Sequence, residues 1–582
     1  MYTRLVNVQI VIALLKAHGI RHLVLSAGQS NYPFVHSVES DPYFTCYSVV
    51  DERSAAFYAV GLAQELGEPV AISCTASTAC CNYISAITEA YYQKVPILVL
   101  TSDRDVRKRG QLETLMIEQD HMYRDITKKE VVLPDINQPG DFRYCERIVN
   151  EAILELNHRG KGPVHINMPS YGKANAVDVE KLPEVHKISR YEYAKQQLWN
   201  TKKEELKQAK RIMLLVGQHE TFTESELCAL DEFYSKYNCV IVEEHMGNIK
   251  RPYVLNMNPV ISNTSGGPLQ ELAPDILITM GTHIQVGWAR FAEMHPIHWC
   301  VNENGDLIDA CECLTDIFEC SDLQFLEYFA KDMSTENDGE FYGIWRKAVD
   351  AISCPELPLS HVFSIQNLLK RLPERGILHL SIQNSIRLSQ YFDIPEGVKC
   401  YANLGGLGID GSMSTFLGQA AANPNPAYLI IGDLSFFYDM NSLKIKHNGN
   451  NVHIMLLNNG GGAEFYQNNG KNETIDLHTA ARHHSDAKAW AEACGFQYYG
   501  VKTKEEYLDV IDEFVGEHDA PALLEVFTDL ETDMNALREL NRVNCVMDPE
   551  PRLKAAARKV LGPKGVAIAK KAVAKLRKGL DR

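Results

Sequence analysis

Short apolar runs bounded by turn residues alternate along the chain with amphipathic stretches of helical spacing. In the first third of the chain these runs lie at residues 22–28, 69–77, 95–103 and 162–169. Apolar runs of this length are typical of strands that are buried on both faces of a parallel sheet. The pattern therefore predicts a layered α/β fold, with helices such as one over residues 52–65 covering the sheet.

The same alternation continues through two further blocks. Apolar runs recur at 211–218, 239–245, 275–283 and 297–305, and again at 376–382, 427–435, 452–462 and 522–530. Polar, Pro-bearing residues separate the second block from the third. We predict three α/β domains with mostly parallel sheets, at residues 1–185, 186–345 and 346–545, followed by a tail at residues 546–582.

Composition narrows the class of protein and its partners. The chain is 45% hydrophobic and 23% charged, as globular proteins are, and its net charge of −17 disfavours nucleic acid as a partner. No apolar run is long enough to span a membrane, and the first twenty residues resemble an amphipathic helix more than a signal peptide. The fifteen cysteines include no CxxC pair, which favours reduced thiols over a zinc site. We expect a cytoplasmic protein.

The tail carries the opposite charge. Residues 552–582 contain eleven Lys or Arg and a single acid, Asp581, with apolar residues interleaved at helical spacing. A basic amphipathic helix can dock on an acidic protein surface or lie on an anionic membrane. We expect docking on the acidic remainder of the chain or on a second subunit, with membrane contact as the alternative.

The most informative motif joins two strand ends. Asp433 closes one apolar run, and after 24 intervening residues Asn458 closes the next. Asn459 follows directly, and Gly461 comes two residues after it. In a parallel sheet both ends lie at the carboxyl edge, where α/β proteins bind their ligands. A carboxylate, an amide oxygen and a backbone carbonyl are the hard ligands that Mg²⁺ prefers, with diphosphate oxygens completing the shell.

These motifs resemble those of the thiamine diphosphate (ThDP) enzymes. The resemblance rests on the segments GDLSFFYDMNSL, LLNNGGG, YANLGGLGIDG, DERSAAFYAVGLA and CTASTACCN, and it covers roughly residues 5–535. The segments are most similar to the synthase branch of menaquinone biosynthesis, which is related to acetolactate synthase. The resemblance implies a pyrimidine-binding, a central and a diphosphate-binding domain, in that order.

The resemblance also assigns cofactor residues. Asp433, Asn459 and the Gly461 carbonyl correspond to ligands of Mg²⁺, and Ile409 corresponds to the bulky side chain that holds the cofactor in its bent conformation. Further cofactor contacts are implied for Thr78, Asn384, Ser385, Gly408, Gly432, Leu434, Ser435 and Gly462.

Glu52 carries the central catalytic prediction. Read by itself, a Glu after Asp51 at a helix start is a solvated capping residue. Within DERSAAFYAVGLA it matches the family's catalytic glutamate, which drives proton transfer in the pyrimidine ring of the cofactor. In this family that glutamate serves a cofactor held by another subunit, so the resemblance implies a homodimer or a homotetramer.

Three positions depart from the menaquinone branch. The first strand-to-helix turn contains Gln29 and Ser30, and Ser30 stands where the branch has an arginine. A second family arginine is Leu404. Counting without gaps places the family's active-site glutamine at Leu115, although Glu113, Glu118 and Gln119 lie near enough to leave that register open. The loss of planar guanidinium donors weakens the binding of substrate carboxylates. We therefore expect a less acidic substrate and a reaction other than the menaquinone one.

Several polar or aromatic residues remain as substrate candidates. Arg104 follows the strand at 95–103, Arg387 follows Asn384, and each is either a substrate contact or a surface ion-pair partner. His121 is either an acid-base group or structural. Glu464, next to Phe465, is either an acid-base group or a helix-start carboxylate. His483 and His484 are expected to be structural and to lie outside the reaction centre.

The predicted function is ThDP- and Mg²⁺-dependent decarboxylation of a 2-oxo acid, with transfer of the acyl unit to an acceptor. The alternatives are simple 2-oxo-acid decarboxylation and a non-catalytic ThDP-fold scaffold. Neither the donor nor the acceptor can be read from the motifs.

Overall fold

The computed structural model describes residues 1–170, 176–466 and 472–547. They form two compact units, one made of residues 1–204 and 297–325, the other of residues 205–296 and 326 onward. The chain passes between the units three times: within α7 (Asn200–Gln208), directly before β14 (Ile297–Val301), and within α12 (Asp322–Ala330). The predicted basic tail beyond residue 547 lies outside the described residues, and the predicted three-domain division stays a prediction.

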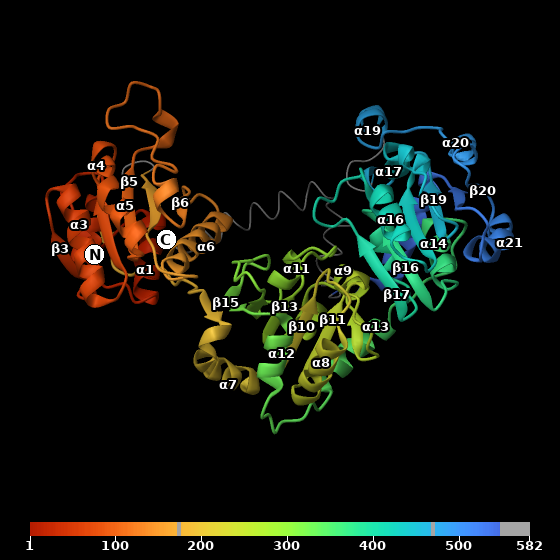
Figure 1. Ribbon diagram of the computed structural model, residues 1–582, viewed down its shortest axis with the longest axis horizontal. Coiled ribbons are helices and arrows are strands. Elements are labelled where there is room, and N and C mark those ends of the chain that lie inside the picture. The colour runs from red at the N-terminus through yellow and green to blue at the C-terminus, as the bar shows by residue number, and fades with distance from the viewer. Residues whose placement is uncertain (171–175, 467–471, 548–582) are drawn as a thin grey trace, which may run out of the picture. The chain divides into compact units, whose positions relative to one another are not determined.

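The first unit is built on a six-stranded parallel sheet in the order β3-β2-β4-β5-β7-β6. Figure 1 shows its helices lying on both sides of the sheet. The strands are β2 (His22–Leu25), β3 (Thr45–Ser48), β4 (Val70–Cys74), β5 (Ile97–Asp103), β6 (Glu130–Val132) and β7 (Val164–Pro169), and the helices are α1 (Val6–Ala17), α2 (Tyr32–Glu39), α3 (Glu52–Leu66), α4 (Thr78–Asn82), α5 (Ile84–Gln93) and α6 (Pro139–Glu155).

Two apolar clusters hold this unit together, one on each face of the sheet. One joins α1 and α6 to the sheet, and the other joins α3 and α5 to it. The unit also contains a short antiparallel pair and three parallel strands. These are β1 (Tyr2–Thr3) with β8 (Val177–Val179), and β14 (Ile297–Val301), β15 (Leu314–Glu319) and β9 (Ser189–Glu192).

The second unit contains two groups of parallel strands. The first runs β12-β11-β10-β13, from β10 (Ile212–Val216), β11 (Cys239–Glu243), β12 (Val254–Asn256) and β13 (Ile276–Met280). Its helices are α8 (Glu224–Lys236), α9 (Asn258–Asn263), α10 (Gly267–Glu271), α11 (Ala289–Ala292) and α13 (Glu340–Asp350).

The second group is a six-stranded parallel sheet, β17-β16-β18-β19-β21-β20. Its strands are β16 (Arg375–Leu380), β17 (Gly397–Ala402), β18 (Ala427–Gly432), β19 (Val452–Asn458), β20 (Gln497–Val501) and β21 (Ala522–Phe527). Its helices are α14 (His361–Leu369), α15 (Asn384–Ser389), α16 (Ser412–Ala421), α17 (Asp433–Tyr438), α19 (Glu473–His478), α20 (Lys488–Ala493), α21 (Lys504–Val515) and α22 (Leu530–Asn544).

The predicted α/β class with mostly parallel sheets is confirmed. Each apolar run in the first and third blocks forms a strand of a parallel sheet, as continuous burial on both faces requires. Among the described helices, none has both the length and the apolar character that crossing a bilayer requires. All fifteen cysteines are free thiols.

Candidate active site

The strand ends of the second unit bring the predicted metal ligands together. Gly432 pairs with Leu457 across β18 and β19, so Asp433 and Asn459 leave the sheet at the same edge. Asp433 is buried at the start of α17, and its Oδ2 accepts hydrogen bonds from the backbone N–H groups of Asn459 (3.2 Å), Gly460 (2.8 Å) and Gly461 (3.0 Å). The Asp433 carboxylate therefore organises the glycine turn.

Glycine is required in this turn by its backbone. Gly461 has φ +145°, and a Cβ there would lie 2.6 Å from the Ala480 carbonyl oxygen. Gly460 has φ +76°. Only glycine adopts such angles at little cost, so the NNGGG pattern records the shape of this loop.

The two ends of the Asn459 side-chain amide differ in their hydrogen bonding. Its Nδ2 donates to Asp533 Oδ2 at 2.8 Å, while its Oδ1 is buried and makes no hydrogen bond with any described residue. A buried amide oxygen without a donor needs a partner, because leaving it unsatisfied costs about 1–3 kcal/mol. A cation would satisfy it.

His483 lies against the same carboxylate. Its Nε2 is 3.3 Å from Asp433 Oδ2, and its backbone N–H donates to the Gly460 carbonyl. His483 therefore lies beside a candidate metal ligand, a contact that was not expected from the sequence. The helix pattern of the segment 486–496 could not reveal this contact, because the loop before that helix folds back over the glycine turn. His484 is exposed.

The remaining cofactor candidates of the second unit surround this edge. Asn384 begins α15, and its Oδ1 is buried without a partner among the described residues. Ser385 and Ser435 are buried in the first turns of their helices, and Leu434 donates its backbone N–H to Asp433 Oδ1. Ile409 is 38% exposed in the loop after β17. A wedge residue has to be accessible in this way. Gly408 precedes Ile409, and Gly462 packs beside Phe465.

In the first unit, Glu52 is half-buried at the first position of α3. The capping role belongs to Asp51, whose side chain accepts from Ser54 N at 2.7 Å, and this hydrogen bond lowers the pKa of Asp51. Glu52 makes no hydrogen bond or ion pair within the described part of the chain. The side-chain cap of α3 is therefore Asp51, and the catalytic role of Glu52 stays a prediction.

The turn after β4 faces the first strand-to-helix turn. Ser77 has φ +67°, and its backbone N–H donates to Gln119 Oε1 at 2.7 Å. Thr78 follows it, exposed, at the start of α4. Ser30 Oγ hydrogen-bonds Thr75 Oγ1 and accepts from Ala76 N, whereas Gln29 is exposed. The Ser30 hydroxyl therefore braces this turn.

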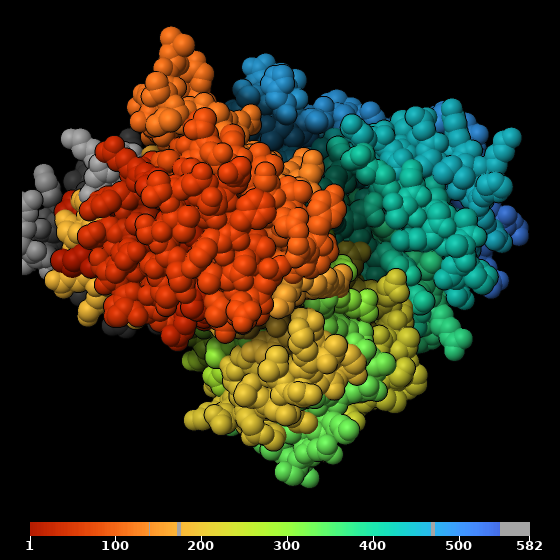
Figure 2. Space-filling model, turned by 60° about the vertical axis from the view of Figure 1, so that its left-hand side comes forward, coloured from red at the N-terminus to blue at the C-terminus, as the bar shows by residue number. Residues whose placement is uncertain are grey.

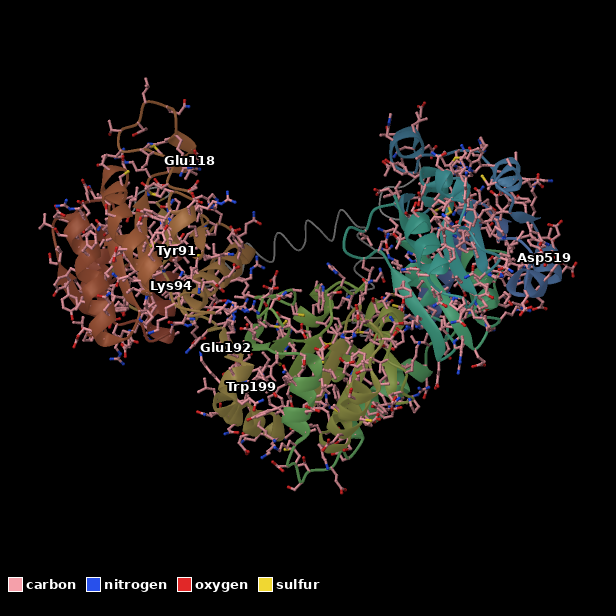
Figure 3. All side chains as sticks on the ribbon, viewed as in Figure 1. Tyr91, Lys94, Glu118, Glu192, Trp199 and Asp519 are labelled. Carbon is pink, nitrogen blue, oxygen red and sulfur yellow. The ribbon has the colours of Figure 1, made fainter. Side chains whose placement is uncertain are left out.

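The loop between β5 and β6 projects into solvent, as Figure 2 shows, and Figure 3 labels Glu118 within it. Leu115 is 52% exposed with φ +60°. Arg104 pairs with Glu113 at 3.2 Å and donates to the Thr114 carbonyl at 2.8 Å, which fits the ion-pair interpretation. His121 is exposed and lies 3.9 Å from Glu130.

The substrate candidates of the second unit fall into three places. Leu404 is buried in the apolar core of the sheet. Arg387 is exposed and lines a groove of about 790 Å³ together with Arg290. Glu464 lines a small cavity with Asn384, and Phe465 is 38% exposed.

Comparison with known proteins identifies the family. The model of the thiamine pyrophosphate enzyme N-terminal TPP binding domain matches residues 7–128, and that of the C-terminal TPP binding domain matches residues 383–526. A relative from Phocaeicola vulgatus, named 2-succinyl-5-enolpyruvyl-6-hydroxy-3-cyclohexene-1-carboxylate synthase, is 37% identical over 93% of this chain and 98% of its own length. This chain belongs to the thiamine diphosphate enzyme family.

Other relatives of this ThDP enzyme carry the same name. The Bacteroides fragilis protein is 37% identical over 93% of this chain and 99% of its own, and the Christiangramia forsetii protein is 30% identical over 92% and 98%. These names give no support to the expectation, drawn from Ser30, Leu404 and Leu115, that the chain works outside this synthase branch.

The residues present fit the cofactor and its metal. Asp433, the free Asn459 Oδ1 and a Gly461 carbonyl form an all-oxygen set suited to Mg²⁺. Within the described ranges, no three His, Cys, Asp or Glu side chains gather as a metal cluster. The chain is a ThDP-dependent enzyme.

Proposed function

We propose that this enzyme decarboxylates a 2-oxo acid and transfers the resulting acyl unit to an acceptor, as a synthase of the branch to which its relatives belong. The observation that carries the proposal is the near full-length similarity to proteins named as synthases. The presence of Asp433, Asn459 and Glu52 supports it, because a scaffold protein would not need all three.

Each of these residues has a distinct role in the proposal. ThDP, when bound, supplies the nucleophilic carbon that attacks the 2-oxo group. Asp433, Asn459 and the Gly461 carbonyl hold the Mg²⁺ that anchors the diphosphate. Ile409 would contact the cofactor as its wedge residue, and Glu52 would hold a proton at the pyrimidine ring nitrogen.

The relatives' name sets the first substrates to try. Their product carries a succinyl group on a cyclohexene carboxylate, so 2-oxoglutarate and isochorismate are the first donor and acceptor. A second candidate is a less acidic pair. The observation behind this second pair is that Leu404 is buried in the core and Ser30 hydrogen-bonds Thr75. Neither residue supplies a guanidinium to bind a substrate carboxylate.

The proposal includes that the enzyme forms a homodimer or a homotetramer and that it lies in the cytoplasm. In ThDP enzymes the glutamate acts on a cofactor held by a second subunit. The face of α3 and α5 supports a partner copy, because it exposes Phe57, Tyr58, Ile84 and Tyr92 (44%, 47%, 41% and 76%). Large apolar side chains exposed on two helices that pack together are candidates for an interaction surface. Equilibrium sedimentation tests the subunit count, and a monomer would contradict it.

Calorimetric titration of ThDP with Mg²⁺, followed by carbon dioxide release from a panel of 2-oxo acids, tests the reaction. Product analysis with and without isochorismate then separates transfer from simple decarboxylation. Efficient turnover of 2-oxoglutarate with isochorismate would select the first substrate pair, whereas turnover of monocarboxylic oxo acids alone would select the second. Absence of ThDP binding would refute the proposed function.

A further inference from the structure

The two asparagines of the cofactor loop each rest on a different buried carboxylate. Asn458 Nδ2 donates to Glu525 Oε1 at 2.7 Å, and Asn459 Nδ2 donates to Asp533 Oδ2 at 2.8 Å. The two side chains therefore turn to different partners, although they are neighbours in sequence. Only Asn459 keeps a buried oxygen without a partner among the described residues.

Donors surround the Asp533 carboxylate. Besides Asn459, the Thr528 hydroxyl donates to its Oδ2 at 2.7 Å, and the backbone N–H of His361 donates to its Oδ1 at 2.8 Å. The His361 ring nitrogen Nε2 lies 3.1 Å from Oδ2. Asp533 is 7% exposed and lines the small cavity that also contains Glu464. Asp533 is thus a buried carboxylate with several hydrogen-bond donors, and one of these donors is the candidate metal ligand Asn459.

The chemistry of a carboxylate decides how Asn459 is oriented. Ionised Asp accepts hydrogen bonds and donates none, whereas an amide has one accepting and one donating end. Asn459 must therefore turn its NH₂ toward Asp533 and its Oδ1 away from it. This holds independently of how the amide was assigned, because the opposite orientation would place two acceptors face to face.

We propose that Asp533 is a positioning residue that selects the orientation of Asn459 in which oxygen faces the metal. The inference rests on the proposed function, because it takes Asn459 as a ligand of Mg²⁺. Partners behind metal ligands orient them, and their loss costs about 10-fold to 100-fold in metal affinity. The aspartate would act through Asn459 and without touching the metal.

The test is Mg²⁺ titration of the full-length enzyme at saturating ThDP. Asp533→Asn keeps the shape, but its own NH₂ would face Asn459 while its oxygen still accepts from His361. The Asn459 amide then turns over and presents NH₂ to the metal. We expect the apparent Mg²⁺ affinity to fall by about 10-fold to 100-fold.

Glu244→Gln is the matched control. Glu244 is a buried carboxylate in the same unit that accepts from Asn258 Nδ2 at 2.6 Å and from two backbone N–H groups. Its loss should lower the melting temperature, as Asp533→Asn also should, while leaving Mg²⁺ affinity unchanged. An equal fall in affinity in both variants would overturn the inference, since it would then report only general destabilisation.

A reciprocal exchange separates orientation from folding. In the double variant Asn459→Asp with Asp533→Asn, position 459 has two equivalent oxygens, so one accepts from position 533 and the other always faces the metal. We expect Mg²⁺ affinity to return toward that of the unmodified enzyme. Affinity that stays low in the exchange, or that is unchanged in Asp533→Asn, would overturn the inference. Failure of the unmodified enzyme to bind Mg²⁺ with ThDP would instead refute the proposed function.

Discussion

The candidate metal side, in the second unit, and the acid side, at Glu52 in the first unit, are built to different degrees. Asp433 accepts four backbone hydrogen bonds, and Asn459 is held at both its backbone and its amide nitrogen. Glu52, in contrast, makes no hydrogen bond or ion pair with the described residues. The folding of one sheet therefore completes the metal side. The acid side is left with an unpaired carboxylate at a helix start, for which the described part of its own unit supplies no partner.

The largest expected effect lies on the acid side. Glu52→Gln keeps the shape but removes the group that holds the proton, so kcat should fall by about 10²-fold to 10⁴-fold. ThDP and Mg²⁺ binding should be unchanged, because the metal side is separate. Steady-state kinetics and calorimetry measure the two quantities. Asp51→Asn, which alters the neighbouring cap, is the control. A Glu52→Gln enzyme with near-normal kcat would show that the unpaired carboxylate is not the catalytic acid.

The second effect breaks the metal side. Asp433→Asn places an amide NH₂ or a weaker acceptor against the three N–H groups of the glycine turn, and removes a charged ligand. We expect Mg²⁺ affinity at saturating ThDP to fall at least about 100-fold, because a first ligand matters more than its supporting partners. Asp439→Asn is the control, since Asp439 accepts from Ser414 at the far end of α17. Unchanged affinity in Asp433→Asn would place the metal elsewhere.

A third variant tests the turn itself. Gly461→Ala introduces a Cβ against the Ala480 carbonyl at a φ of +145°, so the free energy of unfolding should fall by about 1–3 kcal/mol. Gly418→Ala, in the exposed interior of α16 with no neighbour within 4 Å, should raise it by about 0.5–1 kcal/mol. Chemical denaturation measures both changes. Equal effects would mean that the turn is not strained.

The buried histidine of β16, His379, should make the free energy of unfolding depend on pH. Burial in β16 lowers the pKa of His379 to about 4, from 6.5. Between these values the unfolded chain binds a proton that the folded chain does not, so this group contributes a loss of stability as pH falls from 6.5 toward 4. The slope is at most about 1.4 kcal/mol per pH unit. His379→Gln should flatten the profile measured by denaturation at pH 5 and pH 7. A profile that keeps its slope in this variant would assign the acid sensitivity to other groups.

The smallest effect should come from Arg104. Its partner Glu113 is on an exposed loop, and exposed ion pairs contribute about 0–1 kcal/mol. Arg104→Ala should therefore change the free energy of unfolding by less than that, with kcat/KM nearly unchanged. A loss of kcat/KM beyond about tenfold, that is about 1.4 kcal/mol, would restore the substrate-binding interpretation.

The features of the candidate metal site that depend on local sequence pattern could be predicted. Buried parallel strands need continuous apolar runs, so the strands that carry Asp433 and Asn459 and their shared edge could be predicted. Asp533 lies 74 residues beyond Asn459, and no local period links them. The contact of His483 with Asp433 was missed for the same reason. Leu404 and Leu115 both stand where the branch has a polar side chain, yet Leu404 is buried and Leu115 is exposed, because tertiary packing decides which loop residues face the core.

One feature of the first unit links two segments that are remote in sequence. Gln119 is fully buried, and it also donates to the Ser102 carbonyl and to Asn167, so it fixes the far end of the projecting loop. The same side chain accepts the N–H of Ser77, the residue with positive φ before Thr78. A displacement of the loop that pulled Gln119 away would let the Ser77 backbone relax. The conformations of the loop and of the turn after β4 are therefore coupled through one side chain, the amide of Gln119.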